Sequence, residues 1–115
     1  MMTIKEKIYE ARAEIAKALA HKTRLKIIDI LHEEGGHCVC ELTEILDVSQ
    51  STVSKHLGVL KNAGVVSSKK EGLNVTYTLR IPCVKNFFGC LDQMIRENIE
   101  KKTEELKTVG RVKDE

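Results

Sequence analysis

Four cysteines carry the most reactive side chains of this sequence: Cys38, Cys40, Cys83 and Cys90. Two of them are separated by a single residue, in the run His37-Cys38-Val39-Cys40. Thiolates prefer soft metal ions to hard ones, so this pair has the chemistry to capture a soft ion. A Cys-x-Cys pair nevertheless supplies only two ligands, and a thiolate site with more ligands needs groups from elsewhere.

The other two cysteines, Cys83 and Cys90, stand seven residues apart in a predicted helix. Two helical turns place them on one face, but about 10.5 Å apart along the axis at 1.5 Å per residue. They cannot bind one ion together while the helix is intact, and they cannot form a disulfide with each other. Each would have to pair with another element, such as the Cys38–Cys40 pair or a partner subunit.

Each cysteine also has a purely structural interpretation, as a small buried residue. This interpretation fits Cys90 best, because it lies among apolar residues, and it fits the Cys-x-Cys pair least. Cys83 is predicted at a helix N-terminus, where the helix dipole lowers the pKa of a thiol. His32 and His37 are either accessory ligands near the thiols or helix-end residues exposed to water.

The elements that must position these residues follow from hydrophobic periodicity, which predicts five helices. They are residues 3–20, a helix capped by Thr23 and ended by Gly35-Gly36, residues 39–46, a helix from Ser49 or Gln50 to Gly64, and residues 82–106, with Pro82 in its first turn. The helix before Gly64 directs Val53, Leu57 and Leu60 inward.

Two strands are predicted between the last two helices, at residues 65–68 and 73–79, with Glu71-Gly72 at the turn. The second strand directs one alternating set inward, namely Leu73, Val75, Tyr77 and Leu79. The order is therefore ααααββα, a mostly helical fold with a β-hairpin. At 115 residues the chain is expected to form a single domain.

Two short helices joined by a tight turn, the second capped by small polar residues, match the helix-turn-helix pattern of DNA-binding proteins. The outer side of the second helix offers groups that bond base edges or phosphates. The candidate DNA contacts on it are Gln50, Ser51, Thr52, Ser54, Lys55 and His56, with packing as the alternative role of His56.

Basic charge is concentrated near this helix. Residues 49–80 carry a formal charge of +4, and the rest of the chain carries −2, which suggests a local polyanion-binding surface. Lys69 and Lys70, expected at the hairpin tip, would flank the duplex and touch phosphate or the minor groove. Residues 39–79 therefore predict a winged helix-turn-helix that binds double-stranded DNA.

Two runs resemble the ArsR/SmtB-type repressors: Ala18–Ile28, at the entry to the second helix, and Ser49–Val66, at the recognition helix. The similarity covers roughly residues 10–95. It implies a homodimer joined through helices 3–20 and 82–106, a palindromic operator, and release when an inducer binds elsewhere. Such pairing would also bury apolar stripes that one small core is not expected to absorb.

The run His37–Leu42 resembles the Cys-Val-Cys-(Asp/Glu)-Leu box of soft-metal sensors in that family. The resemblance implies arsenite, antimonite or a soft divalent ion such as cadmium or lead as inducer, with no obligatory cofactor. Thr43 stands where arsenite-type boxes often have a third cysteine, and the first 37 residues contain none. The third thiolate must then be Cys83 or Cys90, or solvent or a small thiol must replace it.

Other members of that family sense oxidants or reactive sulfur through one thiol near the second or third helix and one on the last helix. That is the main alternative, and a non-sensing DNA-binding protein of the same fold is another. The last helix has Asp92 and Glu97 but no histidine, which argues against a histidine-rich zinc site there.

Enzymatic and membrane functions are not expected. No catalytic motif supports an enzyme, and no apolar run approaches the ~20 residues that span a bilayer. The charged N-terminus lacks the apolar core of a signal peptide. We therefore expect a cytosolic protein whose cysteines are thiols.

Overall fold

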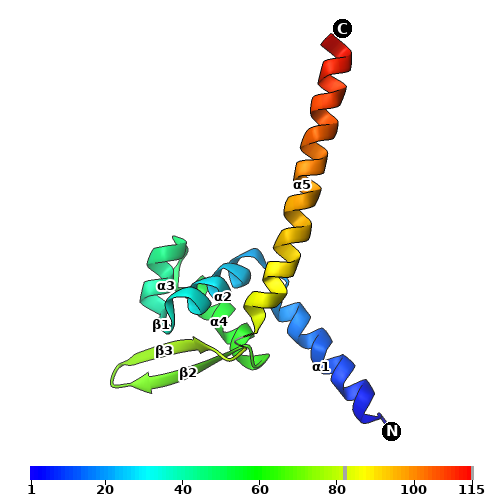
Figure 1. The fold of residues 1–115 in the computed structure, drawn as a ribbon. Coiled ribbons are helices and arrows are strands. Elements are labelled where there is room, and N and C mark those ends of the chain that lie inside the picture. The colour runs from blue at the N-terminus through cyan, green and yellow to red at the C-terminus, as the bar shows by residue number, and fades with distance from the viewer. Residues whose placement is uncertain (82, 115) are drawn as a thin grey trace. The chain divides into compact units, whose positions relative to one another are not determined.

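The computed structural model describes the backbone of residues 1–81 and 83–114 and the side chains of 1–81 and 83–107. Its elements, in chain order, are α1 (Ile4–Leu19), α2 (Lys22–Glu34), β1 (His37–Cys38), α3 (Val39–Leu46), α4 (Gln50–Asn62), β2 (Val66–Glu71), β3 (Asn74–Leu79) and α5 (Val84–Asp114) (Figure 1). The chain forms two compact units, residues 1–82 and 83–115. The predicted mostly helical fold with a β-hairpin is confirmed.

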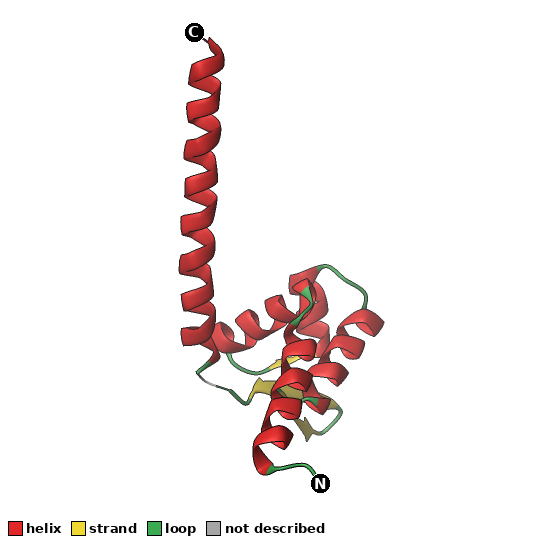
Figure 2. Ribbon diagram, turned by 90° about the vertical axis from the view of Figure 1, so that its right-hand side faces the viewer, coloured by secondary structure: helices red, strands yellow, loops and turns green. Residues whose placement is uncertain are grey.

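The core of the first unit is aliphatic and lies among α2, α3, α4 and β2. Figure 2 shows the strands beside these packed helices. The predicted inward stripe of α4 is confirmed, since Val53, Leu57 and Leu60 are fully buried. Their buried partners are Ile27, Ile28, Leu31, Leu42, Val65 and Val66. This core fixes α4 against α2 and α3, and it thereby leaves the opposite side of α4 open to solvent.

Glycines end α2 and α4 as predicted. Gly35 has φ 83° at the C-cap of α2, and Gly64 has φ 80° after α4, both in the region that glycine adopts without strain. At Gly64 the backbone N–H of Val65 donates to Leu60 at 2.9 Å and that of Gly64 to Lys61 at 3.0 Å, which is a Schellman motif. The start of α2 was predicted wrongly. His21, not Thr23, is its N-cap, because Nδ1 of His21 accepts the Thr23 N–H at 3.1 Å.

A tight turn joins α3 to α4, and Asp47 enables it. Asp47 adopts the left-handed conformation, with φ 54° and ψ 46°, and its N–H donates to the carbonyl of Thr43 at 3.0 Å. Aspartate tolerates this conformation better than most residues. Ser49 then caps α4. The predicted helix–turn–helix arrangement of α3 and α4 is confirmed.

The sheet has three strands rather than the two predicted. Its order is β1-β3-β2, all antiparallel, so β3 is the central strand. The sequence pattern missed β1 because a two-residue strand shows no alternation and is defined only by its distant partner.

The hairpin differs from the prediction in the position of its turn, which was expected at Glu71-Gly72. Strand β2 continues to Glu71, and Glu71 pairs with Asn74, which leaves Gly72 and Leu73 as the turn. Leu73 was predicted to point inward, but it is fully exposed at this turn. The inward direction of Leu73 was therefore wrong.

The second unit contains α5, which is longer than the predicted 82–106 helix, since it continues to Asp114; Pro82 lies outside the described residues. Helix α5 carries exposed apolar side chains, namely Phe87, Met94, Ile95, Ile99 and Leu106. In the first unit, α1 likewise exposes Ile4, Ile8 and Ile15. Within the described residues, no helix combines the length and apolar content needed to cross a membrane.

Candidate functional site

The N-terminus of α4 is built around the hydroxyl of Ser49. Its Oγ accepts the backbone N–H of Thr52 at 3.2 Å, lies 2.7 Å from Thr52 Oγ1 and 3.2 Å from Ser51 Oγ. A side-chain cap of this kind satisfies an N–H group that the helix cannot pair internally. The result is a cluster of hydroxyl groups at the positive end of the helix dipole, which favours an anion such as a phosphate.

One side of α4 presents polar side chains to solvent. Gln50, Ser51, Ser54 and Lys55 are all exposed, and the pairs Gln50/Ser54 and Ser51/Lys55 are each four residues apart, so they share a face. The buried stripe lies on another face of the same helix. Four of the six predicted contacts on α4 therefore lie together on a face that can enter a groove.

His56 occupies a different environment from those four residues. It is half-buried, Nη1 of Arg24 lies 3.4 Å from its Nδ1, and its ring centroid is 4.3 Å from that of His21. Burial first, and then the charges of His21, Arg24 and Lys55, lower the pKa of His56. The structure thus gives His56 the packing role that the sequence offered as an alternative, while its contact with DNA stays a prediction. Thr52 is also half-buried.

The wing lysines lie within β2 rather than at the hairpin tip, where they were predicted. Lys69 is opposite Thr76 and Lys70 is opposite Val75, so the two side chains point to opposite faces of the hairpin. Both are exposed, and Nζ of Lys69 lies 3.5 Å from Oε1 of Glu71. An exposed ion pair of this kind contributes little to stability, and a DNA phosphate can replace Glu71 as the partner of Lys69.

Cys38 forms the N-cap of α3, directly before the reading motif. Its side chain faces the backbone N–H of Glu41, and Oε1 of Glu41 accepts the backbone N–H of Cys38 at 3.3 Å. This reciprocal arrangement is a capping box in which cysteine takes the place of serine or threonine. This capping box was not predicted, although the spacing Cys38-x-x-Glu41 matches its pattern.

Glu41 also shifts the pKa of the Cys38 thiol. The backbone N–H of Glu41 acts to lower the pKa of Cys38, but the hydrogen bond to the Glu41 carboxylate, burial and the negative charge of Glu41 together raise it above its ordinary value. The same contacts, that from the Cys38 side chain first, lower the pKa of Glu41. Cys38 is therefore held mainly as a thiol until something displaces its proton.

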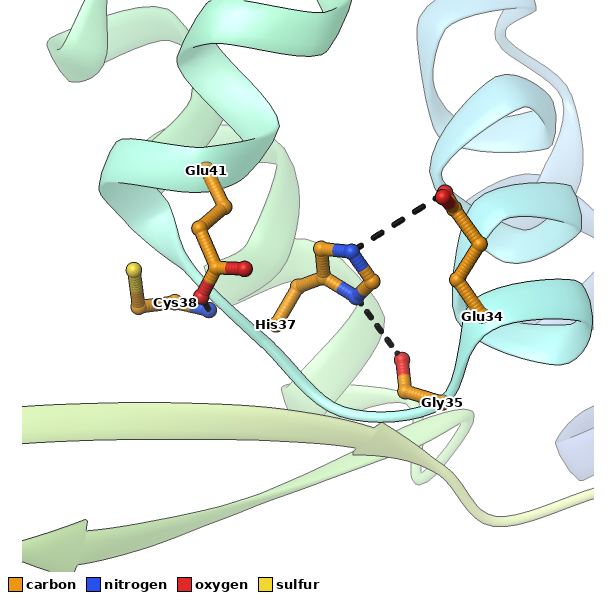
Figure 3. A network of polar contacts seen from close by, with 5 residues as sticks. All are labelled: Glu34, Gly35, His37, Cys38 and Glu41. Carbon is orange, nitrogen blue, oxygen red and sulfur yellow. Dashed lines mark hydrogen bonds and ion pairs between the residues drawn. The ribbon is translucent and has the colours of Figure 1, made fainter.

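His37 fastens the loop between α2 and α3, as Figure 3 shows. Only 7% of it is exposed, and its Nδ1 lies 2.9 Å from the carbonyl oxygen of Gly35. Since a carbonyl only accepts, Nδ1 carries the proton. Nε2 faces Oε2 of Glu34 at 3.9 Å. The imidazole points toward Glu34 and Gly35, and the sulfur of Cys38 points the opposite way. His37 therefore holds the loop before α3 and does not lie beside the Cys38 thiol as a second ligand.

All four cysteines are free thiols: Cys38 is half-buried, and Cys40, Cys83 and Cys90 are exposed. Cys90 is therefore not the small core residue that its apolar neighbours suggested. Cys83 directly precedes α5, and both it and Cys90 belong to the second unit. In the described part of the chain, no group of three or more His, Cys, Asp and Glu residues comes together to hold a metal ion. His32, the other suggested accessory ligand, is half-buried.

Comparisons with known proteins identify the family. Residues 21–68 match the model of the arsR family of bacterial regulatory proteins. The uncharacterized HTH-type transcriptional regulator MJ1325 of Methanocaldococcus jannaschii is 40% identical over 92 residues, which are 80% of this chain and 91% of that protein.

Two relatives have names that describe a resistance function. A cadmium resistance transcriptional regulatory protein CadC homolog of Staphylococcus aureus is 45% identical over 58% of this chain and 55% of its own length. The arsenical resistance operon repressor of Escherichia coli is 42% identical over 57% and 56% respectively. The chain thus spans about half the length of these two relatives.

Solved structures share the fold. The homodimeric winged helix-turn-helix DNA-binding domain of Mb0332 from Mycobacterium bovis, a possible ArsR-family regulator, matches with a TM-score of 0.74 and 27% identity over 88% of this chain and 93% of that one. HlyU from Vibrio cholerae matches with a TM-score of 0.66 and 35% identity over 77% and 96%. The chain therefore belongs to the arsR family of bacterial regulatory proteins, and it is a DNA-binding transcriptional repressor rather than an enzyme.

Proposed function

We propose that this repressor works as a homodimer and leaves its operator when a soft metal or metalloid ion binds Cys38 and Cys40. The ion would be arsenite, antimonite or a soft divalent cation such as cadmium. The observation that carries the proposal is the position of the two thiols. Cys38 is the N-cap and Cys40 lies in the first turn of α3, the helix that directly precedes the recognition helix.

The names of the relatives support the same inducer class. The segment matched by the family model includes both thiols, and the relatives include regulators of cadmium and arsenical resistance. Soft thiolates suit these ions. A third ligand would come from Cys83, Cys90, solvent or a small thiol, and this proposal leaves the choice to experiment.

The pairing of Cys38 with Cys40 favours an ion over an oxidant. Cys38 is the N-cap of α3 and Cys40 lies in its first turn, so one short segment offers two of the thiolate ligands that soft ions prefer. Redox or reactive-sulfur sensing remains the second candidate, because Cys40, Cys83 and Cys90 are exposed free thiols.

Operator binding would use the polar face of α4 and the wing lysines. Gln50, Ser51, Ser54 and Lys55 would contact base edges and phosphates in the major groove, and Lys69 and Lys70 would contact phosphate beside it. Thr52 and His56, both half-buried, would position the helix. Pairing two subunits through the exposed apolar residues of α1 and α5 would set two recognition helices about one DNA turn apart.

The decisive experiment is operator release. An operator is first selected from a random DNA pool with the reduced protein, and its binding is followed by fluorescence anisotropy. Arsenite, cadmium, zinc, copper(I), persulfide and peroxide are then added separately. Arsenite or cadmium should weaken binding by about 5–150-fold, the usual range of allosteric coupling.

Paired variants assign the thiols. Cys38→Ser/Cys40→Ser should bind the operator normally and no longer respond, while Cys83→Ser/Cys90→Ser reports whether α5 supplies a ligand. Normal release of the Cys38→Ser/Cys40→Ser protein by arsenite would refute the assignment of the box. Affinity unaffected by every compound in the wild-type protein would identify a non-sensing regulator.

A further inference from the structure

The sensor thiol and the wing belong to one sheet. Cys38 of β1 pairs with Thr76 of β3, and Thr76 pairs in turn with Lys69 of β2. Because β3 is central, these three residues form one row across the sheet. The backbone of Cys38 is thus connected to that of a wing lysine through a single intervening residue.

Cys38 also caps α3, the first helix of the helix-turn-helix. The side chain of Cys38 faces the N–H of Glu41 in α3, while its backbone belongs to the sheet. A sulfur drawn toward a bound ion cannot keep its capping position unless the backbone of Cys38 moves with it. That backbone is held to β3 by a strand of only two residues, so few hydrogen bonds resist the movement.

We propose that Cys38 couples ion capture to the wing by releasing β1 from β3, a proposal that rests on the function proposed above. When Cd²⁺ binds, each thiol of Cys38 and Cys40 gives its proton to solvent and forms a sulfur–cadmium bond, with no change of oxidation state. Displacement of Cys38 then removes β1 from its place beside Tyr77 and Thr76 of β3, while the inner end of β2 stays anchored in the core through Val66. A two-stranded hairpin without a third strand or a helix against it is only marginally stable in water, so the outer part of the hairpin, with Lys69 and Lys70, loses its fixed position and the operator is released.

Gly36 makes this connection testable. A Cβ atom added to Gly36 would lie 2.7 Å from Cγ2 of Thr76, 3.1 Å from Cγ2 of Thr78 and 3.6 Å from the carbonyl oxygen of Tyr77. The first distance is too short for two carbon atoms, and the threonine methyl belongs to a stiff, β-branched side chain. Gly36→Ala therefore separates the segment that leads into β1 from β3 without changing a thiol or a residue of the DNA-reading face.

The experiment measures Cd²⁺ binding and operator affinity separately. Binding is followed by the ultraviolet absorption of the cadmium–thiolate bond, and coupling is the ratio of operator affinities without and with saturating Cd²⁺. We expect Gly36→Ala to bind Cd²⁺ through its thiolates and to have weakened operator affinity before Cd²⁺ is added. Its coupling ratio should be at least about fivefold below that of the wild type, a factor equal to the smallest typical allosteric coupling. Thr76→Ser alone should behave like the wild type, and Gly36→Ala/Thr76→Ser, which removes the closest methyl group, should recover coupling.

A measurement on the unmodified protein guards against a variant that does not fold. Amide hydrogen exchange with and without Cd²⁺, in the absence of DNA, should show faster exchange at Cys38 and across β2 and β3, and no such change in Cys38→Ser/Cys40→Ser. A Gly36→Ala protein that binds Cd²⁺ and keeps wild-type coupling would overturn the proposal. The proposal would also be overturned if the wild-type protein releases DNA when loaded with Cd²⁺ but shows unchanged amide exchange in β2 and β3. In both cases the metal-sensing function itself would stand. Failure of the wild-type thiols to bind cadmium or arsenite would instead overturn both.

Discussion

Arg24 of α2 and His56 of α4 meet through their side chains, with Nη1 of Arg24 3.4 Å from Nδ1 of His56. Because a guanidinium only donates, Nδ1 of His56 must accept and its imidazole must be neutral. Arg24 is half-buried, and its Nε is buried without a hydrogen-bond partner in the described residues, so the contact with His56 supplies the guanidinium with an acceptor through Nη1. The pair therefore fixes the recognition helix to the start of α2 in a way that depends on protonation.

The first prediction concerns pH. The pKa of His56 lies below its ordinary value of 6.5 in the folded protein. Between that lowered value and 6.5, the unfolded chain binds a proton that the folded protein does not, so the free energy of unfolding must fall as pH drops below about 6.5. Denaturant unfolding at a series of pH values checks this, with protein concentration held constant because dimers unfold in a concentration-dependent way.

His56→Gln provides the control for the pH experiment. Glutamine keeps an acceptor for Arg24 but does not titrate, so the pH dependence of the free energy of unfolding below about 6.5 should become flatter. The pKa of Glu41 is also shifted, but it is lowered from an ordinary value of 4.5. The contribution of Glu41 to the free energy of unfolding is therefore lost only as the pH falls below about 4.5, outside the range in which His56 acts. An unchanged slope in His56→Gln would show that His56 does not carry the effect.

The second prediction concerns the capping role of Cys38. Serine is a preferred N-cap and alanine a poor one, so Cys38→Ser should be more stable than Cys38→Ala by about 1 kcal/mol. Cys40 provides a matched comparison, because it is exposed within the first turn of α3 and caps nothing. There alanine should equal or exceed serine, since it has the higher helix propensity. The same order at both positions in urea unfolding would contradict the capping role.

The local parts of this fold follow from the sequence, and the non-local parts do not. The stripe Val53-Leu57-Leu60 and Gly64 were sufficient to place α4 and its end, because both depend on helical periodicity and on the conformational freedom of glycine. The short strand β1 was missed because His37 and Cys38 become a strand only by pairing with Tyr77 and Thr76. A segment of two residues is too short to show a periodicity that would predict this pairing.

The candidate site divides in the same way. The exposed face around Gln50 and Lys55 follows from the buried stripe of the same helix. The packing of His56 depends on Arg24, which is 32 residues away, and was therefore only one of two alternatives in the sequence. Ligands beyond Cys38 and Cys40 depend on tertiary and subunit contacts that spacing along the chain does not determine.

The third prediction tests the DNA-reading face of α4. Lys55→Ala should lower operator affinity and reduce the slope of log affinity against log salt by about 0.9 for each subunit's phosphate contact, or about 1.8 for the dimer. Lys61→Ala is the control, because Lys61 is an exposed lysine in the last turn of the same helix, away from its reading end. Fluorescence anisotropy from about 50 to 200 mM salt measures both slopes. A slope equal to the wild type in Lys55→Ala would exclude a phosphate contact for Lys55.

The fourth prediction tests the proposed dimer. Ile8 of α1 is 45% exposed, and together with Ile4 and Ile15 it forms an apolar stripe, since these residues recur at helical spacing. A stripe of this kind is expected to be covered by a second subunit. Ile8→Gln should therefore shift the protein toward monomer in sedimentation velocity and weaken operator binding, because one subunit reads only half of a two-fold site.

Ala13→Gln is the matched control for the dimer experiment. Ala13 is also exposed, but at 100° per residue it lies on the far side of α1 from Ile8. The same side chain is introduced in both variants, so helix propensity and polarity are comparable and only the face differs. Dissociation in Ile8→Gln but not in Ala13→Gln assigns this stripe to the subunit interface. Equal sedimentation of both variants and the wild type as dimers would place the interface elsewhere, and α5 with its exposed Phe87 and Met94 would then be the surface to alter next.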